Sequence, residues 1–160
     1  MENVLKRVYA SRRISSTLKI VSHLCVLISV AAYAVLVASS FIDSVWRGTS
    51  IIALGGAPFV IVTFARRWIN APRPYELYDF YEKRPKEKSG QSLPSRHVFS
   101  SFTVATLSYL LSPWIAVALG ALGILLAVSR VLLGMHFIRD VVAGALIGII
   151  SGIIGLIIVI

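Results

Sequence analysis

The stretch SRVLLGMHFIRD, residues 129–140, separates two long apolar runs, residues 114–128 and 141–160, and carries every charged group between them. Runs of this kind are typical of helices that cross a bilayer, whose hydrocarbon core needs about 20 apolar residues. Ionisable groups are costly in or near a bilayer, so a histidine, two arginines and an aspartate at this place indicate a functional site. The stretch therefore predicts a membrane helix bundle with a polar site at the membrane boundary.

The rest of the chain has the composition of a membrane protein. Of its 160 residues, 57% are hydrophobic and 14% are charged, whereas a soluble domain carries about 25% charged residues. Apolar runs at residues 20–41, 50–65 and 97–111 bring the predicted spans to five. The run at 97–111 contains five Ser and Thr residues, so we expect it inside the bundle rather than against lipid. The fold class predicted is all-α, a polytopic membrane bundle forming a single domain, residues 1–160.

Two polar segments lie outside these runs. Residues 1–19 are basic and irregularly amphipathic, which predicts an interfacial N-terminal helix. Residues 66–96 hold four of the six prolines, which exclude a continuous helix, and several aromatic side chains suited to the membrane–water boundary. We expect this second segment to be the active-site loop.

The distribution of positive charge predicts the orientation. Five Lys and Arg residues lie in residues 1–19, eight in 66–96 and two in 129–140, while Arg47 alone lies on the opposite face. Cytoplasmic segments of membrane proteins are enriched in these residues, so we expect the polar site on the cytoplasmic side of the cell membrane. The net charge of +9 does not indicate nucleic-acid binding, because the cations lie between apolar runs, where anionic head groups are the expected partner.

Three short motifs on the same predicted face carry the chemistry: Arg66-x6-Arg73-Pro74, then Pro94-Ser95-Arg96-His97, then Ser129-Arg130-x5-His136-x3-Asp140. Arginines can hold the oxygens of a phosphate ester and stabilise the charge of its transition state, a role open to Arg66, Arg73 and Arg130. Ser95 just precedes a predicted helix, whose N-terminal end favours an anion. One histidine can attack phosphorus while another protonates the departing oxygen. Four residues separate His136 from Asp140, so a helical turn would let the carboxylate orient the ring.

The three motifs together resemble those of the type 2 phosphatidic acid phosphatase family, Lys-x6-Arg-Pro, Pro-Ser-Gly-His and Ser-Arg-x5-His-x3-Asp. The third motif matches at every defined position, while Arg66 replaces the lysine and Arg96 the glycine. Arg96 either crowds the phosphate or adds a cation to its binding site, and the sequence leaves both open. The resemblance implies that His136 is the nucleophile forming a phosphohistidine, that Asp140 orients it, and that His97 is the general acid. The family usually has six helices with the site facing outward, so five spans and an inward site would depart from it.

A metal centre is the main chemical alternative, because His97, His136 and Asp140 are all possible ligands. The neighbouring arginines would repel a dication and no second carboxylate accompanies them, so we expect neither a metal nor a cofactor.

The function predicted is hydrolysis of a lipid-linked phosphate such as phosphatidate, phosphatidylglycerol phosphate or a polyprenyl phosphate or phosphosugar. A lipid phosphotransferase and a non-catalytic module that binds anionic lipid remain the alternatives. Gly144, Gly148 and Gly152 share one helix face, which serves either packing within the bundle or a homo-oligomer.

Overall fold

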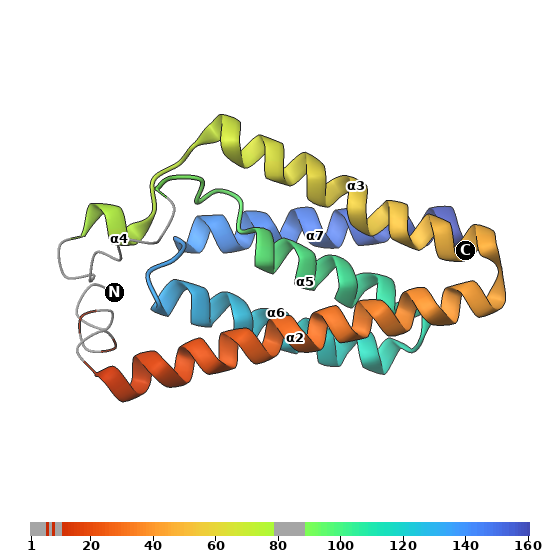
Figure 1. The fold of residues 1–160 in the computed structure, drawn as a ribbon, viewed down its shortest axis with the longest axis horizontal. Coiled ribbons are helices and arrows are strands. Elements are labelled where there is room, and N and C mark those ends of the chain that lie inside the picture. Colours follow the sequence, from red (N-terminus) through yellow and green to blue (C-terminus); the bar gives the residue numbers. More distant parts are fainter. Residues whose placement is uncertain (1–5, 7, 9–10, 79–88) are drawn as a thin grey trace.

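The computed structural model describes residues 6, 8, 11–78 and 89–160, and Figure 1 shows them as a bundle of roughly aligned helices. No strand occurs in this part of the chain, which confirms the all-α prediction. The elements are α2 (Arg12–Asp43), α3 (Val45–Ile69), α4 (Pro74–Leu77), α5 (Arg96–Leu107), the 3-10 helix η1 (Ser108–Leu110), α6 (Pro113–Leu132) and α7 (Ile138–Val159).

Helix α2 is longer at its N-terminus than the sequence analysis predicted. Residues 12–19, which we assigned to a separate interfacial segment, form the first turns of this 32-residue helix. No glycine or proline interrupts residues 12–43, and the side chain of Ser11 caps the helix by accepting from the backbone N–H of Ile14. Of the other residues in the predicted interfacial segment, residues 1–5, 7, 9 and 10 lie outside the described residues.

Helix α3 also extends beyond its predicted bounds, residues 50–65. It begins after Ser44, whose hydroxyl accepts a hydrogen bond of 3.0 Å from the backbone N–H of Arg47. It ends at Asn70, which adopts the left-handed conformation common at helix C-termini. Arg66 and Arg67 are therefore helical, and positive charge is favourable in the last turn because of the helix dipole.

Helix α5 differs most from its prediction as a full membrane span. It has 12 residues and continues only into η1, whereas four longer apolar stretches can cross a membrane by length and composition: Arg12–Asp43, Val45–Leu77, Pro113–Leu132 and Ile138–Val159. The expectation that this helix lies inside the bundle is correct, because α5 packs on α2, α3, α6 and α7. An enclosed helix has no need to match the thickness of the bilayer, which permits its short length.

The predicted glycine face of α7 is used within the chain. A Cβ atom at Gly144 would lie 2.6 Å from the carbonyl oxygen of Ser95, and one at Gly148 would lie 2.5 Å from that of Phe99. A Cβ at Gly152 would collide with Thr106. The three glycines thus let α7 approach the backbone of α5, and a homo-oligomer would have to use another surface.

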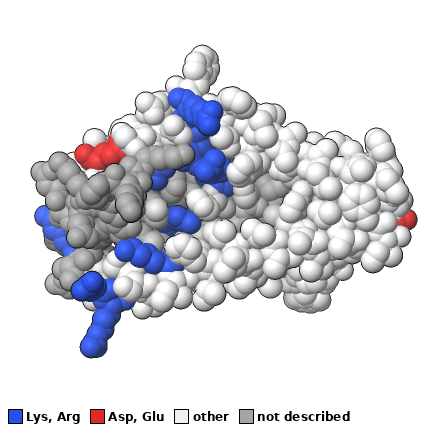
Figure 2. Space-filling view, viewed as in Figure 1, with Lys and Arg blue, Asp and Glu red and all other residues white. Residues whose placement is uncertain are grey.

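Charged and aromatic side chains mark the two ends of the membrane-spanning bundle. Figure 2 shows lysine and arginine gathered at one end, whereas most of the remaining visible surface carries no charge. Trp68 is exposed near that end of α3, and Trp46 and Trp114 are exposed at the start of α3 and α6. Trp46 and Trp68 are separated along the helix by about 33 Å at 1.5 Å per residue, close to the thickness of about 30 Å expected for hydrocarbon.

Candidate active site

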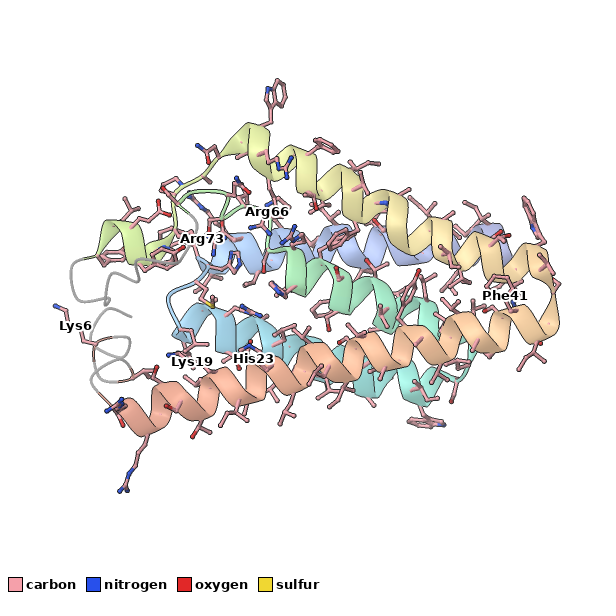
Figure 3. All side chains as sticks on the ribbon, in the orientation of Figure 1. Lys6, Lys19, His23, Phe41, Arg66 and Arg73 are labelled. Atoms are coloured by element: carbon pink, nitrogen blue, oxygen red, sulfur yellow. The ribbon has the colours of Figure 1, made fainter. Side chains whose placement is uncertain are left out.

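The site lies at the charged end of the bundle, where several chain segments meet. The last turns of α3 and α6 and the first turns of α5 and α7 lie at this end (Figure 1), together with the segment 89–95. Figure 3 shows Arg66 and Arg73 there. The antiparallel course of the chain therefore places all three sequence motifs at one end, as predicted.

Arg66 and Arg73 are held by two consecutive backbone carbonyls. Arg66 is buried, and its Nε and Nη2 atoms both donate to the carbonyl oxygen of Gln91, the former at 3.0 Å. The Nε atom of Arg73 donates to the carbonyl oxygen of Gly90 at 2.9 Å. Gly90 and Gln91 both have positive φ, 67° and 57°, so this turn is a specific backbone arrangement rather than an extended strand. One edge of each guanidinium is anchored in this way, which orients the rest of the fork for an anion.

His136 lies against a buried carboxylate and a buried hydroxyl. Its Nδ1 atom is 3.8 Å from Oδ2 of Asp140 and 3.3 Å from Oγ of Ser92. The hydroxyl of Ser92 donates to that same Oδ2. Because the Nδ1 edge of the ring faces these two groups, Nε2 is the nitrogen positioned to meet a substrate.

Sequence reasoning missed Ser92 entirely. The residue is fully buried and its backbone N–H donates to the carbonyl of Ala71 at 2.9 Å. It belongs to none of the three motifs, and a serine in a polar loop carries no signal that separates it from its neighbours. Only the folding of the segment 89–95 against α7 brings its hydroxyl to Asp140.

The spacing of His136 and Asp140 brings them together at the start of α7 rather than within it. His136 precedes the helix, Phe137 is the N-cap, and Asp140 lies in the first turn. The Oδ2 atom of Asp140 accepts from the backbone N–H of Phe137 at 2.9 Å, so it caps the helix as well as facing the histidine. A carboxylate is also favoured here by the positive end of the helix dipole.

The second motif forms the junction before α5. Ser95 is fully buried and is the N-cap of α5, as its place before a predicted helix indicated, and its backbone N–H donates to the carbonyl of Asp140 at 2.9 Å. Arg96 is the first residue of α5, and its guanidinium lies 5.3 Å from the centroid of the Phe59 ring. His97 follows, half-buried, within electrostatic range of Arg130 and His136. The structure thus places His97 at the same end of the bundle as His136.

The site is strongly cationic. Arg130 is buried in the last turn of α6, where its Nη1 atom contacts the sulfur of Met135 at 3.2 Å. Burial lowers the pKa of His136, and the charges of Arg73 and Arg66 lower it further, against the hydrogen bond to Asp140, which raises it. Four arginines thus surround two histidines and one carboxylate, an arrangement suited to a phosphate group.

The residues of the site do not form a cluster of metal ligands. Within the described ranges no group of three His, Cys, Asp or Glu side chains is placed to hold a metal ion. The Oδ2 atom of Asp140 accepts hydrogen bonds from Ser92 and the backbone of Phe137, and the surrounding arginines disfavour a dication. The donor set fits an oxyanion better than a cation.

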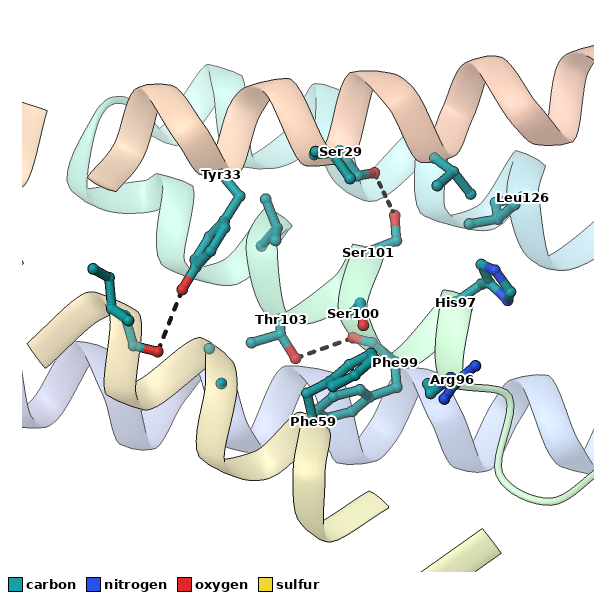
Figure 4. A pocket seen from close by; sticks show the side chains of 16 residues that line it. Ser29, Tyr33, Phe59, Arg96, His97, Phe99, Ser100, Ser101, Thr103 and Leu126 are labelled. Atoms are coloured by element: carbon teal, nitrogen blue, oxygen red, sulfur yellow. Dashed lines mark hydrogen bonds between the residues drawn. The ribbon is translucent and has the colours of Figure 1, made fainter. Parts of the chain in front are cut away.

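A largely apolar cavity of about 520 Å3 begins beside the site. Arg96 and His97 line one end of it and Tyr33 the other, and Figure 4 shows these residues with Phe59 between them. The hydroxyl of Tyr33 donates to the carbonyl of Ile51 at 3.1 Å, which fixes its ring between α2 and α3. The apolar residues on the rim are exposed at the surface that faces lipid: Val30, Ile52 and Phe59. The cavity therefore reaches the exposed apolar side of the bundle.

Comparisons with known proteins identify the family and the fold. The family model described as the PAP2 superfamily matches residues 24–159. A lipid A 1-phosphatase of Porphyromonas gingivalis is 35% identical over 82 residues, 49% of this chain, but the match spans only 18% of that relative's length. The crystal structure of Aquifex aeolicus LpxE is similar with a TM-score of 0.71 and 28% identity, covering 96% of this chain and 93% of that one. A PAP2-type phosphatidylglycerolphosphate phosphatase from Bacillus subtilis shares the fold, with a TM-score of 0.75 and 22% identity over 98% of this chain and 83% of that one.

Proposed function

Because the chain belongs to the PAP2 superfamily, we propose that it hydrolyses a lipid-linked phosphate at the membrane boundary through a phosphohistidine on His136. The observation that carries the proposal is the contact of Nδ1 of His136 with Ser92 and Asp140, which leaves Nε2 as the nucleophilic atom. A neutral imidazole is required for attack, and the lowered pKa of His136 favours that form. No cofactor enters the proposed reaction.

The reaction proceeds in two steps. In the first, Nε2 of His136 forms a bond to phosphorus while the bond between phosphorus and the lipid oxygen breaks, and His97 gives its proton to that oxygen. Burial and the charge of Arg130 lower the pKa of His97 to about 3, so the negative charge of the bound phosphate has to raise that pKa before His97 can act as the acid. The guanidinium groups of Arg66, Arg73 and Arg130 hold the equatorial oxygens, whose charge they neutralise in the transition state. In the second, His97 takes a proton from water as the water attacks phosphorus, which releases inorganic phosphate and frees His136. Asp140 orients the ring and stabilises its positive charge in the intermediate.

The cavity between α2, α3 and α5 supports a lipid substrate. It starts at His97 and its walls are mostly apolar, so a chain attached to the leaving oxygen can enter it directly. Phosphatidate, phosphatidylglycerol phosphate and polyprenyl phosphates or phosphosugars all present a phosphate on such a chain. The names of the lipid A 1-phosphatase and the phosphatidylglycerolphosphate phosphatase relatives support the same general class.

The site is proposed to face the cytoplasm. Arg12, Arg13 and Lys19 at the start of α2 lie at the same end as the arginines of the site, and the opposite end carries Arg47, paired with Asp43 at 2.5 Å. Positively charged segments are retained on the cytoplasmic side during insertion. A cytoplasmic site would suit a lipid intermediate made on the inner leaflet.

The proposal is tested with the purified protein in detergent and a panel of lipid phosphates, with release of inorganic phosphate as the readout. We expect turnover by the unaltered protein and a loss of about 10³-fold or more in His136→Ala. The matched control is His23→Ala, since His23 is exposed and bonds only the carbonyl of Lys19 one turn earlier in α2 among the contacts described.

Two other outcomes would replace the proposal. Transfer of phosphate to a second lipid, with none released, would indicate a phosphotransferase that uses the same phosphohistidine. Binding of anionic lipid that is equal in His136→Ala and the unaltered protein, with no turnover of any lipid phosphate, would indicate a non-catalytic module.

A further inference from the structure

Glu76 lies on α4, the short helix that follows the first motif at the charged end of the bundle (Figure 1). Pro74 and Tyr75 on the same helix are buried, which fixes α4 against the fold. The half-buried side chain of Glu76 reaches the segment before α5, where its Oε1 atom accepts a hydrogen bond of 2.6 Å from the backbone N–H of Gly90. None of the three motifs includes Glu76.

Gly90 is bound through both of its backbone polar groups. Its N–H donates to Glu76, and its carbonyl oxygen accepts from Nε of Arg73 at 2.9 Å. The backbone N–H of Glu76 donates in turn to the carbonyl oxygen of Arg73 at 3.0 Å. These three hydrogen bonds form a closed ring, so Glu76 and Arg73 fix the same glycine from two sides.

The turn at Gly90 and Gln91 is one that needs such support. Both residues have positive φ, and Gln91 carries a side chain that disfavours this conformation. Glycine, for its part, loses more backbone entropy on ordering than any other residue. The turn must nevertheless keep its place, because its two carbonyls anchor Arg73 and Arg66.

The charge of Glu76 excludes a direct contact with the phosphate, because a carboxylate repels an anion. A carboxylate is well suited to the backbone, however, since a hydrogen bond from an N–H to a charged acceptor is stronger than one to a neutral acceptor. Glu76 can therefore act on the site through the turn and the two arginines that the turn anchors.

We propose that Glu76 is a positioning residue for phosphate binding: it fixes the turn at Gly90 and Gln91, and thereby holds the guanidinium groups of Arg73 and Arg66 in place before the substrate arrives. The inference rests on the proposed function in that these arginines bind a phosphate group. Donors that are already ordered bind an anion without a further loss of conformational entropy. Without the carboxylate, the phosphate would have to order the turn and both arginines itself.

The experiment uses the purified protein in detergent and two separate assays. The affinity for inorganic phosphate is obtained from its effect on thermal unfolding, which requires no turnover. The values of kcat and KM are obtained with short-chain phosphatidate. The variants are Glu76→Ala and Glu76→Gln, the second of which keeps an acceptor oxygen but has no charge. The control is Asp43→Ala, which removes an exposed carboxylate that bonds Arg47 at the opposite end of the bundle.

We expect Glu76→Ala to weaken phosphate binding and to raise KM, each by about 10-fold, while kcat falls by less than about 3-fold. Glu76→Gln should recover most of the loss, because its amide oxygen can still accept from Gly90. Asp43→Ala should leave the phosphate affinity and KM unchanged. A purely structural role of Glu76 would lower the amount of folded protein, and with it the apparent kcat, but would not change KM or the phosphate affinity.

Gly90→Ala disturbs the same turn while the carboxylate stays in place. The added Cβ would collide with Oδ1 of Asn70, and the positive φ is unfavourable for a side chain. Phosphate binding should weaken in this variant too, and adding Glu76→Ala to it should weaken binding by less than about 3-fold more. Losses that multiply in full would show that Glu76 does not act through the turn.

The remaining outcomes separate this inference from the proposed function. Unchanged phosphate affinity in Glu76→Ala, or a loss confined to kcat, would overturn the positioning role of Glu76. Failure of the unaltered protein to bind phosphate would overturn it as well. If the unaltered protein binds phosphate but hydrolyses no lipid phosphate, the proposed function fails, and a weaker phosphate affinity in Glu76→Ala would still support the positioning role.

Discussion

The backbone N–H of Ser95 donates a hydrogen bond of 2.9 Å to the carbonyl oxygen of Asp140. This bond joins the residue before α5 to the first turn of α7, and so joins the element that carries His97 to the one that follows His136. Gly144 reinforces the junction, because only a residue without a side chain permits this approach of the two helices. The relative placement of the two histidines therefore depends on helix packing as much as on the motifs themselves.

Ser92→Ala should lower kcat by about 10-fold, with little change in KM, because the hydroxyl holds the carboxylate that orients His136. A hydrogen bond to a charged group contributes about 1.5–3 kcal/mol, so a small loss of thermal stability should accompany the change. Phosphate release and thermal unfolding in detergent measure the two effects. Ser39→Ala, which removes a hydroxyl bonded to the carbonyl of Leu36 in its own helix, is the control. Full activity in Ser92→Ala would show that the hydroxyl is dispensable.

In a plot of kcat/KM against pH, the fall on the acidic side (the acidic limb) should have its midpoint below the usual histidine pKa of about 6.5. Burial lowers the pKa of His136, and its neutral, nucleophilic form therefore persists to lower pH. Asp140→Asn removes the carboxylate whose charge-assisted hydrogen bond and negative charge raise this pKa, so the limb should move to still lower pH while kcat falls. The substrate's own ionisation is common to both proteins and cancels in the comparison. A limb that moves upward in Asp140→Asn would contradict the assignment of His136.

Gly144→Ala should destabilise the fold and lower activity, because its Cβ would lie 2.6 Å from the carbonyl oxygen of Ser95. Overpacking of this kind costs about 1–3 kcal/mol, and relief of the clash would move the start of α5, and His97 with it. Gly120→Ala is the matched control, since a Cβ there meets nothing within 4 Å and alanine favours the helix. Thermal unfolding in detergent measures stability and phosphate release measures activity. Equal behaviour of the two variants would refute close packing at Gly144.

Gly56→Leu should narrow the lipid cavity without disturbing the fold, because a Cβ at Gly56 meets nothing within 4 Å and the residue lines the cavity. We expect kcat/KM to fall by about 10-fold for long-chain phosphatidate and by less than about 3-fold for a short-chain analogue. Activity with both substrates measures the difference. If kcat/KM fell equally for the long-chain and the short-chain substrate, the acyl chain of the lipid would have to bind outside this cavity.

The orientation can be tested with two exposed single cysteines, Ser89→Cys in the segment before α5 and Thr49→Cys near the start of α3, at the other end of the bundle. The native Cys25, which is buried, is first replaced by alanine. A membrane-impermeant maleimide added to intact cells should label the cysteine at position 49 and spare the one at position 89 until the cells are opened. The reverse pattern would place the site outside.

Local features of the sequence predicted much of the fold and of the candidate site. The apolar runs predicted the long helices, because a bilayer core requires apolar side chains over a whole span. Each motif lies at the end of a predicted helix. Counting the helices after the polar loop therefore predicted that the motif arginines and both histidines lie on one face of the membrane: Arg66, Arg73, Arg130, His97 and His136. The bounds were less accurate, since helices α2 and α3 continue through polar residues until a capping residue ends them.

The tertiary structure decided which distant groups touch. Ser92 reaches Asp140 across 48 positions in the chain, and Arg96 reaches the Phe59 ring on a different helix. The enclosure of α5, the use of the glycine face inside the chain and the apolar cavity beside His97 likewise depend on how the helices pack. Spacing along one helix determines which residues share its face, because the helical repeat is constant. Contacts between helices depend on side-chain shape at every crossing, and no local pattern in the sequence records that.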